Sequence, residues 1–190
     1  MDGPENVYEV PQGLPEPEDD GACDHLPGMR MPSVSLTSTA GDPVDLSTLT
    51  GTTVVYCYPL TGRPDQDLPP GWDDIPGARG CTPQSCAFRD HHAELKELGA
   101  RVFGLSTQDT NYQREAAGRL HLPFPLLSDV KLEFARALGL PTFEAEGMTL
   151  IKRLTLVIEE GEIKHAFYPV FPPGRNAEEV VRWLSERRTQ

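Results

Sequence analysis

Two kinds of segment are missing from this 190-residue sequence: a long apolar run and a basic cluster. No stretch reaches about 18 consecutive apolar residues, which a membrane-spanning helix needs. The first residues also lack the basic and apolar regions of a secretory signal. Phosphate backbones are bound by clustered Lys and Arg, which the chain does not have. These absences argue against a membrane or nucleic-acid partner, and we expect a cytoplasmic protein.

Positive charge is scarce, most of all at the start of the chain. The sequence has 29 acidic and 17 basic residues, a formal net charge of −12, and its first 29 residues contain no Lys or Arg. This beginning is also rich in proline, which is typical of an extended or disordered arm. We therefore predict a solvated, acidic, proline-rich N-terminal arm, residues 1–30. The alternative is an arm that lies on the domain surface through its apolar residues Val7, Tyr8, Val10, Leu14 and Leu26. The rest, residues 31–190, has the length of one folded domain with one core.

Cysteine is also scarce, with four residues in the chain. In a reducing compartment such a set does not predict a disulfide framework, and a close pair favours catalytic, redox or metal-binding chemistry. Cys81 and Cys86 form a close pair. Cys57 lies in an apolar strand pattern and is expected to be a buried structural cysteine. Cys23 lies in the N-terminal arm and is expected to be an incidental free thiol.

The hydrophobic pattern predicts strands that alternate with helices. A run of β-branched and aromatic residues at 52–58 is typical of a buried strand. The pattern also predicts strands at 34–36, 100–107 and 124–129, helices at 111–122, 130–140 and 176–188, and a hairpin around residues 160–161. This order indicates an α/β fold of thioredoxin-like type, with a central mixed sheet flanked by helices.

Two segments surround the cysteine pair. Residues 60–80 are too rich in Pro, Gly and Asp for regular structure and are predicted to be a loop, called the insert below. Residues 82–99 are predicted to form one helix, with Thr82 as N-cap, Pro83 in the first helical position and Gly99 as the stop. The pair therefore lies at the start of a helix.

This position gives the two thiols different chemistry. Unpaired N–H groups and the helix dipole favour negative charge at a helix start, and the thiolate is the nucleophilic form of cysteine. Cys81 is thus the better-placed nucleophile. Cys86 lies five residues further on, and in an ideal helix the Cα atoms of the two cysteines are about 8.6 Å apart. A disulfide bridges Cα atoms that are at most roughly 7 Å apart. The pair can bond only if the first turn unwinds.

Three interpretations of the pair compete: two buried apolar cysteines, a metal site completed by His91 and His92, and redox chemistry. Successive members of the series Cys81, Cys86 and His91 point about 140° apart around a helix. His92 returns to the face of Cys81, but about 16 Å along the axis. One helix therefore cannot close a metal site, and redox chemistry is favoured.

The motif GCTPQSCAFRD, followed by ELKELGARVFGLST and LPFPLLSD, resembles the Q-type peroxiredoxins. These enzymes are also called bacterioferritin comigratory proteins and belong to the AhpC/TSA peroxiredoxin family; the resemblance covers about residues 31–184. It implies a peroxidatic Cys81, a resolving Cys86 that closes an intramolecular disulfide, and an active-site Arg153. It also implies reduction of hydrogen peroxide and organic hydroperoxides, recycling by thioredoxin or a similar dithiol, a monomer, and no cofactor or metal.

The sequence departs from this family just before Cys81. The family places threonine three residues and proline seven residues before its nucleophile, where this chain has Ala78 and Asp74. The insert separates the motif, so Thr61 is a candidate replacement for the threonine. Trp72 of the insert is a candidate cover for the site entrance.

A second hypothesis is a thiol-disulfide exchange or redox-sensing interaction protein on the same fold, which would dock through the acidic arm. Exchange proteins commonly place their cysteines two residues apart, in C-x-x-C. The four residues between Cys81 and Cys86 favour the peroxidase.

Overall fold

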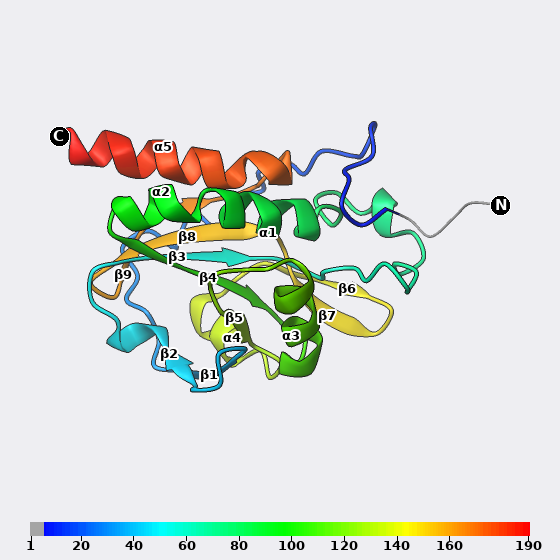
Figure 1. Cartoon of the computed structure of the whole chain (residues 1–190), viewed down its shortest axis with the longest axis horizontal. Helices are drawn as coiled ribbons and strands as arrows, with labels where there is room; N and C mark the ends of the chain where they lie inside the picture. Colours follow the sequence, from blue (N-terminus) through cyan, green and yellow to red (C-terminus); the bar gives the residue numbers. More distant parts are fainter. Residues whose placement is uncertain (1–5) are drawn as a thin grey trace.

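The computed structural model describes residues 6–190, with a seven-stranded mixed sheet at the centre (Figure 1). The sheet has the order β2-β1-β5-β4-β3-β8-β9. Its strands are β1 (Ser35–Ser38), β2 (Val44–Asp45), β3 (Thr52–Cys57), β4 (Ala100–Ser106), β5 (Leu126–Ser128), β8 (Leu154–Glu159) and β9 (Glu162–Phe167). The helices are α1 (Cys81–Asp90), α2 (His92–Glu97), α3 (Thr110–Arg119), α4 (Glu133–Leu138) and α5 (Asn176–Arg188), with one-turn 3-10 helices η1 (Leu46–Thr48), η2 (Trp72–Asp74) and η3 (Pro173–Arg175). The predicted fold, a mixed sheet flanked by helices, is confirmed.

Strand β3 lies in the interior of the sheet. It pairs in parallel with β4 on one side and antiparallel with β8 on the other. Its residues after Thr52 are all buried, as expected for a strand covered on both faces. The side chains alternate, so that Val54 and Tyr56 pack on one face and Val55 and Cys57 on the other.

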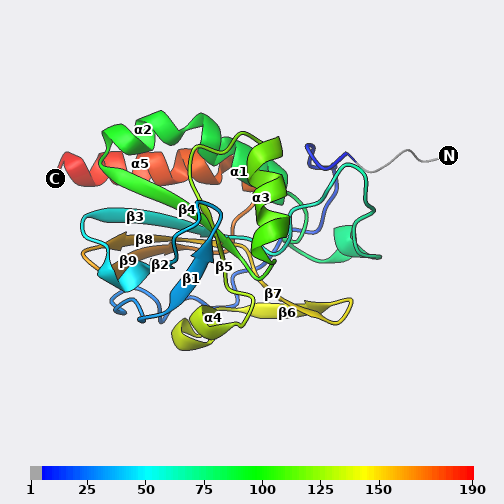
Figure 2. The same ribbon diagram turned by 60° about the horizontal axis from the view of Figure 1, so that its bottom comes forward.

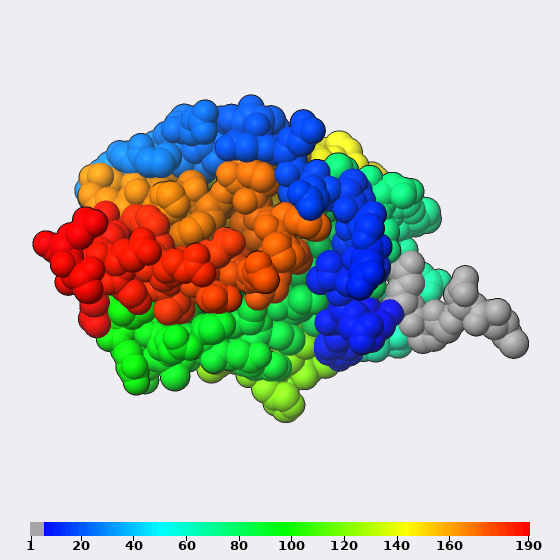
Figure 3. All heavy atoms as spheres, turned by 90° about the horizontal axis from the view of Figure 1, so that it is seen from above, coloured from blue at the N-terminus to red at the C-terminus, as the bar shows by residue number. Residues whose placement is uncertain are grey.

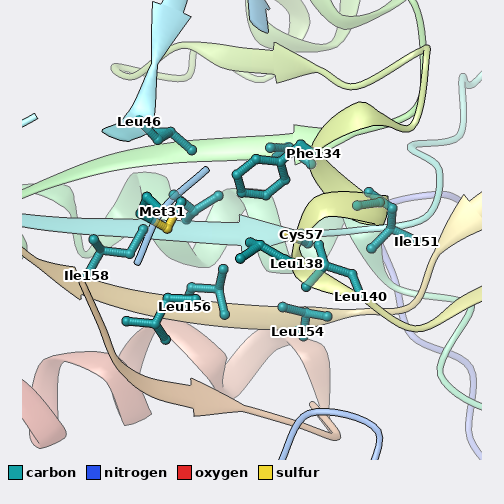
Figure 4. Packing of buried hydrophobic residues seen from close by; sticks show 14 of the residues in the cluster. Met31, Leu46, Cys57, Phe134, Leu138, Leu140, Ile151, Leu154, Leu156 and Ile158 are labelled. Atoms are coloured by element: carbon teal, nitrogen blue, oxygen red, sulfur yellow. The ribbon is translucent and has the colours of Figure 1, made fainter. Parts of the chain in front are cut away.

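Helices α1, α2 and α5 cover the first face of the sheet, and α4 lies across the second, as Figures 1 and 2 show. Phe88, Leu95 and Val180 of the covering helices pack on the first face. Figure 4 shows the second core, where Cys57 lies among leucine and isoleucine side chains close to Phe134 and Leu138 of α4. The prediction of a buried structural Cys57 is confirmed, with a side chain that is 0% exposed.

The predicted helix at residues 82–99 differs from the structure in two respects. Its N-cap is Gly80, with a φ of 110°, and Cys81 is already the first helical residue, so the prediction of a Thr82 cap was wrong. Gly80, two residues before Thr82, adopts a left-handed backbone that glycine accepts without steric strain, so the helix begins before Thr82. The helix also ends at His91, and a separate α2 follows.

A two-stranded sheet next to α4 was not predicted. Strands β6 (Thr142–Ala145) and β7 (Met148–Ile151) form a hairpin. Its two turn residues, Glu146 and Gly147, have φ values of 48° and 74°, which is typical of a two-residue type I′ hairpin turn. The hairpin follows a helix that covers only Glu133–Leu138 of the predicted 130–140, since Leu132 and Gly139 at its ends adopt left-handed backbone.

The N-terminal arm packs on the domain, so the prediction of a solvated tail was wrong for residues 6–30. Leu26 is 0% exposed and Cys23 is 5% exposed, both in the second core. The backbone N–H of Gly28 donates to the carbonyl of Ile163 at 2.7 Å, and the arm borders β9 there. Figure 3 shows the arm, in dark blue, lying along the surface of the domain. Apolar residues spaced between prolines hold it there.

The insert has little regular structure, as predicted, apart from the single turn η2. Trp72 in this turn is 3% exposed and packs with Ala78 and Leu150, and its ring lies 6.0 Å from that of Phe143. The insert is therefore anchored by a small apolar cluster of its own. Across residues 6–190, no helix has both the length and the apolar character needed to cross a membrane.

We predict that Leu26→Ala lowers the free energy of unfolding by about 2–5 kcal/mol, because it leaves a cavity in the core. Urea denaturation of the full chain measures this. The control is Val130→Ala, at a side chain that is 58% exposed, which should change stability by less than about 0.5 kcal/mol. An effect of Leu26→Ala as small as that of the control would mean that the arm is detached in solution.

Candidate active site

Cys81 lies at the buried start of α1. Its side chain is 3% exposed, and Gly80 before it turns the chain into the helix. Any other residue at position 80 would place its Cβ atom 2.3 Å from Cγ of Pro173. Its backbone would also be strained by the positive φ. Glycine is thus required at this position. The backbone places the thiol where the N–H groups of the first helical turn lack helical partners.

Arg153 lies directly beside Cys81, as predicted from the family resemblance. It stands between β7 and β8, is 4% exposed, and its Nη2 donates to the Cys81 sulfur at 3.2 Å. The same nitrogen donates to the carbonyl oxygens of Ala78, at 3.0 Å, and Arg79, at 3.3 Å. The guanidinium therefore joins the sulfur to the chain segment that precedes it.

A buried polar network holds Arg153 in position. Its Nη1 donates to Oε1 of Gln84 at 2.5 Å, and Nε2 of Gln84 donates to Oδ1 of Asn176 at 3.1 Å. The hydroxyl of Thr155 donates to the same Asn176 oxygen at 2.6 Å. Gln84, Thr155 and Asn176 are all 0% exposed. Buried networks of this kind fix side-chain orientation, so Arg153 has little freedom to move away from the sulfur.

Sequence reasoning missed these three supporting residues. Gln84 had a signal, because it lies between the two cysteines, one helical turn after Cys81. Thr155 also had one, since it lies two residues after Arg153, the spacing at which side chains of an extended chain point to the same side. Asn176 had none, because it comes from the distant start of α5.

Cys86 lies in the same helix as Cys81 and is only half-buried. Burial raises the pKa of its thiol, and the nearby positive charge of Arg89 lowers this pKa by a smaller amount. Both cysteines are free thiols. Because both belong to one continuous helix, the separation expected from helix geometry applies, and the two sulfurs cannot bond while α1 is intact.

A small cavity lies next to Cys81. Its volume is about 10 Å³, and it is lined by Val7, Leu60, Gly62, Leu68, Trp72, Arg79, Gly80, Cys81 and Thr82. A volume of this size accommodates about one water molecule. Trp72 therefore does lie at the site. The insert folds back over the start of α1 and forms one wall of the cavity.

Two threonines lie near this cavity with different partners. Thr61 is buried, and both its N–H and its hydroxyl donate to Oε1 of Gln108 at 3.1 Å. Its neighbours in the chain line the cavity, but its own hydroxyl is already engaged. Thr82 lines the cavity, and its buried hydroxyl has no hydrogen-bond partner within residues 6–190. Thr82 is thus the threonine whose hydroxyl is available to a molecule in the cavity.

The remaining cysteines and the histidines lie apart from this site. Cys23 and Cys57 belong to the second core, so the prediction of an incidental thiol on a solvated arm was wrong for Cys23. Nδ1 of His91 lies 2.9 Å from a carboxylate oxygen of Glu94, at the surface. Among the residues that the structure describes, no group of three or more His, Cys, Asp or Glu side chains is arranged to hold a metal ion.

The arrangement suits attack by a thiolate on a small electrophile. A sulfur at a helix start faces a small cavity, and a guanidinium within hydrogen-bond distance stabilises negative charge there. Such fixed donors act strongly because they need no reorganisation as charge moves in the transition state. Arg153 and the free N–H groups of the helix start are those donors.

Known proteins are similar to this chain in sequence and in fold. Residues 26–181 match the family model described as Redoxin. The chain is 33% identical over 153 residues to a chloroplastic peroxiredoxin Q of Gentiana triflora, which covers 80% of this chain and 58% of the relative. It is 33% identical over 159 residues to that of Populus jackii, which covers 83% and 67%. The chain thus spans about three fifths to two thirds of the length of these relatives.

A solved structure extends the similarity to three dimensions. The crystal structure of peroxidoxin BcpB from Mycobacterium tuberculosis matches with a TM-score of 0.69 and 26% sequence identity. The match covers 85% of this chain and 98% of that chain. The similarity therefore includes nearly the whole of the bacterial protein.

We predict that iodoacetamide at pH 8 leaves Cys23 and Cys57 of the folded, reduced protein unmodified. Burial raises the pKa of Cys23 to about 12 and that of Cys57 still further above its usual value, so both remain protonated thiols at this pH. Peptide mass mapping over time measures the modification. The same reaction in urea is the control, where all four cysteines should react. Modification of Cys23 as fast as that of half-exposed Cys86 would contradict its burial under the arm.

Proposed function

The chain belongs to the Redoxin family, with peroxiredoxins of the Q type as its relatives, and we propose that it reduces hydrogen peroxide and organic hydroperoxides with the thiolate of Cys81. One observation carries this proposal: the 3.2 Å contact between the Arg153 guanidinium and the Cys81 sulfur, beside a cavity at the start of α1. A cavity of this kind positions a small substrate against a nucleophile.

The first step is attack of the Cys81 thiolate on the terminal oxygen of a hydroperoxide. The sulfur–oxygen bond forms, the O–O bond breaks, and hydroxide or alkoxide leaves and takes up a proton. Arg153 and the N–H groups of the helix start stabilise the thiolate and the charge that develops on the leaving oxygen. The unpaired hydroxyl of Thr82 is a further donor at the cavity. The product on the enzyme is a sulfenic acid at Cys81.

In the second step, the thiol of Cys86 condenses with this sulfenic acid, releases water and forms a disulfide. Because the two residues share α1, the first turn of the helix must unwind before the sulfurs meet. Rapid capture by Cys86 protects Cys81 from irreversible over-oxidation. The cycle is therefore one of local unfolding and refolding of the helix start.

An external dithiol completes the cycle by thiol-disulfide exchange, and thioredoxin or a similar small protein fits this role. Cys86 is half-exposed, so its sulfur can be reached by a protein partner.

The protein acts as a monomer in the cytoplasm. In residues 6–190, the exposed large apolar side chains are those of Tyr8, Val130 and Met148, and scattered single residues of this kind are ordinary on a monomer surface.

We predict that one equivalent of hydrogen peroxide lowers the mass of the reduced protein by about two daltons, the loss of two hydrogens on disulfide formation. Peptide mapping should find a Cys81–Cys86 linked peptide. Cys81→Ser should abolish peroxide consumption in a coupled assay with thioredoxin and its reductase. Cys86→Ser should still react once, to a sulfenic acid. A linkage through Cys23 or Cys57, or undiminished turnover by Cys81→Ser, would rule out the assignment.

We also predict that Arg153→Met lowers the second-order rate constant for peroxide by roughly 100- to 1,000-fold, because it removes a charged donor at the reacting atoms. Arg153→Lys keeps the positive charge but not the planar, two-pronged guanidinium, so it should lower the rate constant by a smaller factor. The matched control is Arg101→Met, at an exposed position of β4, which should leave the rate unchanged. Stopped-flow fluorescence measures all three. A rate for Arg153→Met within twofold of the control would exclude Arg153 from the reaction.

A further inference from the structure

Two segments far apart in the sequence close the cavity beside Cys81. The insert contributes Leu68 and Trp72, and the N-terminal arm contributes Val7. Figure 3 shows the dark-blue beginning of the arm lying across one end of the molecule. The wall formed by Trp72 is anchored by its cluster with Ala78 and Leu150. The arm is the other wall.

Val7 fills its part of the wall closely. It is 5% exposed, although its neighbours Asn6 and Tyr8 are exposed. A Cβ atom at Gly62 would lie 2.7 Å from Cγ1 of Val7 and 3.0 Å from Cδ2 of Leu68. The valine thus packs directly on the backbone of Gly62, one residue after Thr61. A larger residue at Gly62 would push the arm away from the site.

Two arginines hold the arm in this place. Nη2 of Arg79, two residues before Cys81, donates to the carbonyl of Asn6 at 2.9 Å, and its Nη1 donates to both carboxylate oxygens of Asp73 at 3.0 and 3.2 Å. Arg119 donates to the hydroxyl oxygen of Tyr8 at 3.1 Å and to the carbonyl of Gly62 at 3.0 Å. Around Val7 the arm is therefore held by these polar contacts in addition to the packing of Val7 itself, whereas Trp72 is held by apolar packing alone.

We propose that Val7 is the movable wall of the peroxide site and sets the size of the hydroperoxide that reaches Cys81. The inference rests on the proposed attack of Cys81 on a hydroperoxide. A cavity of about 10 Å³ holds about one water, so hydrogen peroxide, with two heavy atoms, requires only a small displacement. A branched or aromatic organic hydroperoxide requires Val7 to leave. The arm therefore discriminates in favour of small hydroperoxides.

The first test compares kcat/KM for cumene hydroperoxide and for hydrogen peroxide in the full chain. Val7→Ala should raise the ratio of the two values about tenfold, the scale on which apolar pockets discriminate between substrates of different size. Tyr8→Phe removes only the hydroxyl that binds Arg119 and should raise the ratio by a smaller factor without affecting the fold. Val130→Ala is the matched control, since it makes the same change at an exposed valine.

The second test measures access to the thiol without enzyme turnover. Reduced protein is treated with iodoacetamide or with the bulkier N-phenylmaleimide, and modification of Cys81 is followed by peptide mass mapping. Val7→Ala should raise the maleimide rate relative to the iodoacetamide rate, and Val130→Ala should not.

The outcomes separate this inference from the proposed function. Two outcomes would overturn the role of Val7 even if the protein is a peroxidase. In the first, Val7→Ala raises the reaction rates of the small and the large reagent by the same factor. In the second, the kcat/KM ratio and the modification-rate ratio of Val7→Ala both equal those of Val130→Ala. A raised maleimide ratio in a protein that consumes no peroxide would retain Val7 as the wall of the thiol site and reject the peroxidase.

Discussion

The contact between the Arg153 guanidinium and the Cys81 sulfur, at 3.2 Å, is the interaction on which the rest of the site depends. A buried guanidinium is costly unless its N–H groups are bonded. Here the carbonyls of Ala78 and Arg79 and the side chain of Gln84 accept bonds from Nη1 and Nη2, whereas Nε has no partner within residues 6–190. The sulfur is the acceptor that can become an anion, and charge-assisted hydrogen bonds are the stronger ones. Burial of the arginine and nucleophilic chemistry at the thiol therefore support each other.

Helix α1 imposes the second constraint, because the proposed cycle needs it ordered for attack by Cys81 and open for resolution by Cys86. Its start is held by contacts from several segments: Pro173 of η3 packs on Gly80, Val10 of the arm approaches the same glycine, and the Gln84 side chain bonds to Asn176. Forming a disulfide between Cys81 and Cys86 requires some of these contacts to be released. The arm and the insert thus bear on both halves of the proposed cycle, since they line the cavity beside Cys81 and the arm also packs near the start of the helix.

The sequence was sufficient for the sheet, the helix that carries the cysteines and the pairing of Cys81 with Arg153, because alternating apolar patterns and a specific motif determine these features. It was insufficient for features that depend on contacts between segments distant in the sequence. Gly80 was not recognised as the N-cap, since its left-handed backbone and the packing of Pro173 against it arise only in the folded chain. The packing of the arm through Leu26 was the less favoured alternative, because composition describes an arm without its docking surface. Asn176 supports the arginine from a separate helix, with no local pattern to indicate it.

The most direct test of the account is a stopped-flow comparison of two oxidants, hydrogen peroxide and glutathione disulfide, reacting with the reduced protein. Oxidation that unwinds the start of α1 changes the surroundings of Trp72, which lines the same cavity, and its fluorescence provides a signal. The account predicts a second-order rate constant for peroxide at least about 100-fold above that for the disulfide, because Arg153 and the helix start stabilise the transition state of peroxide cleavage. Faster reaction with the disulfide would contradict it and would identify a thiol-disulfide exchange protein instead.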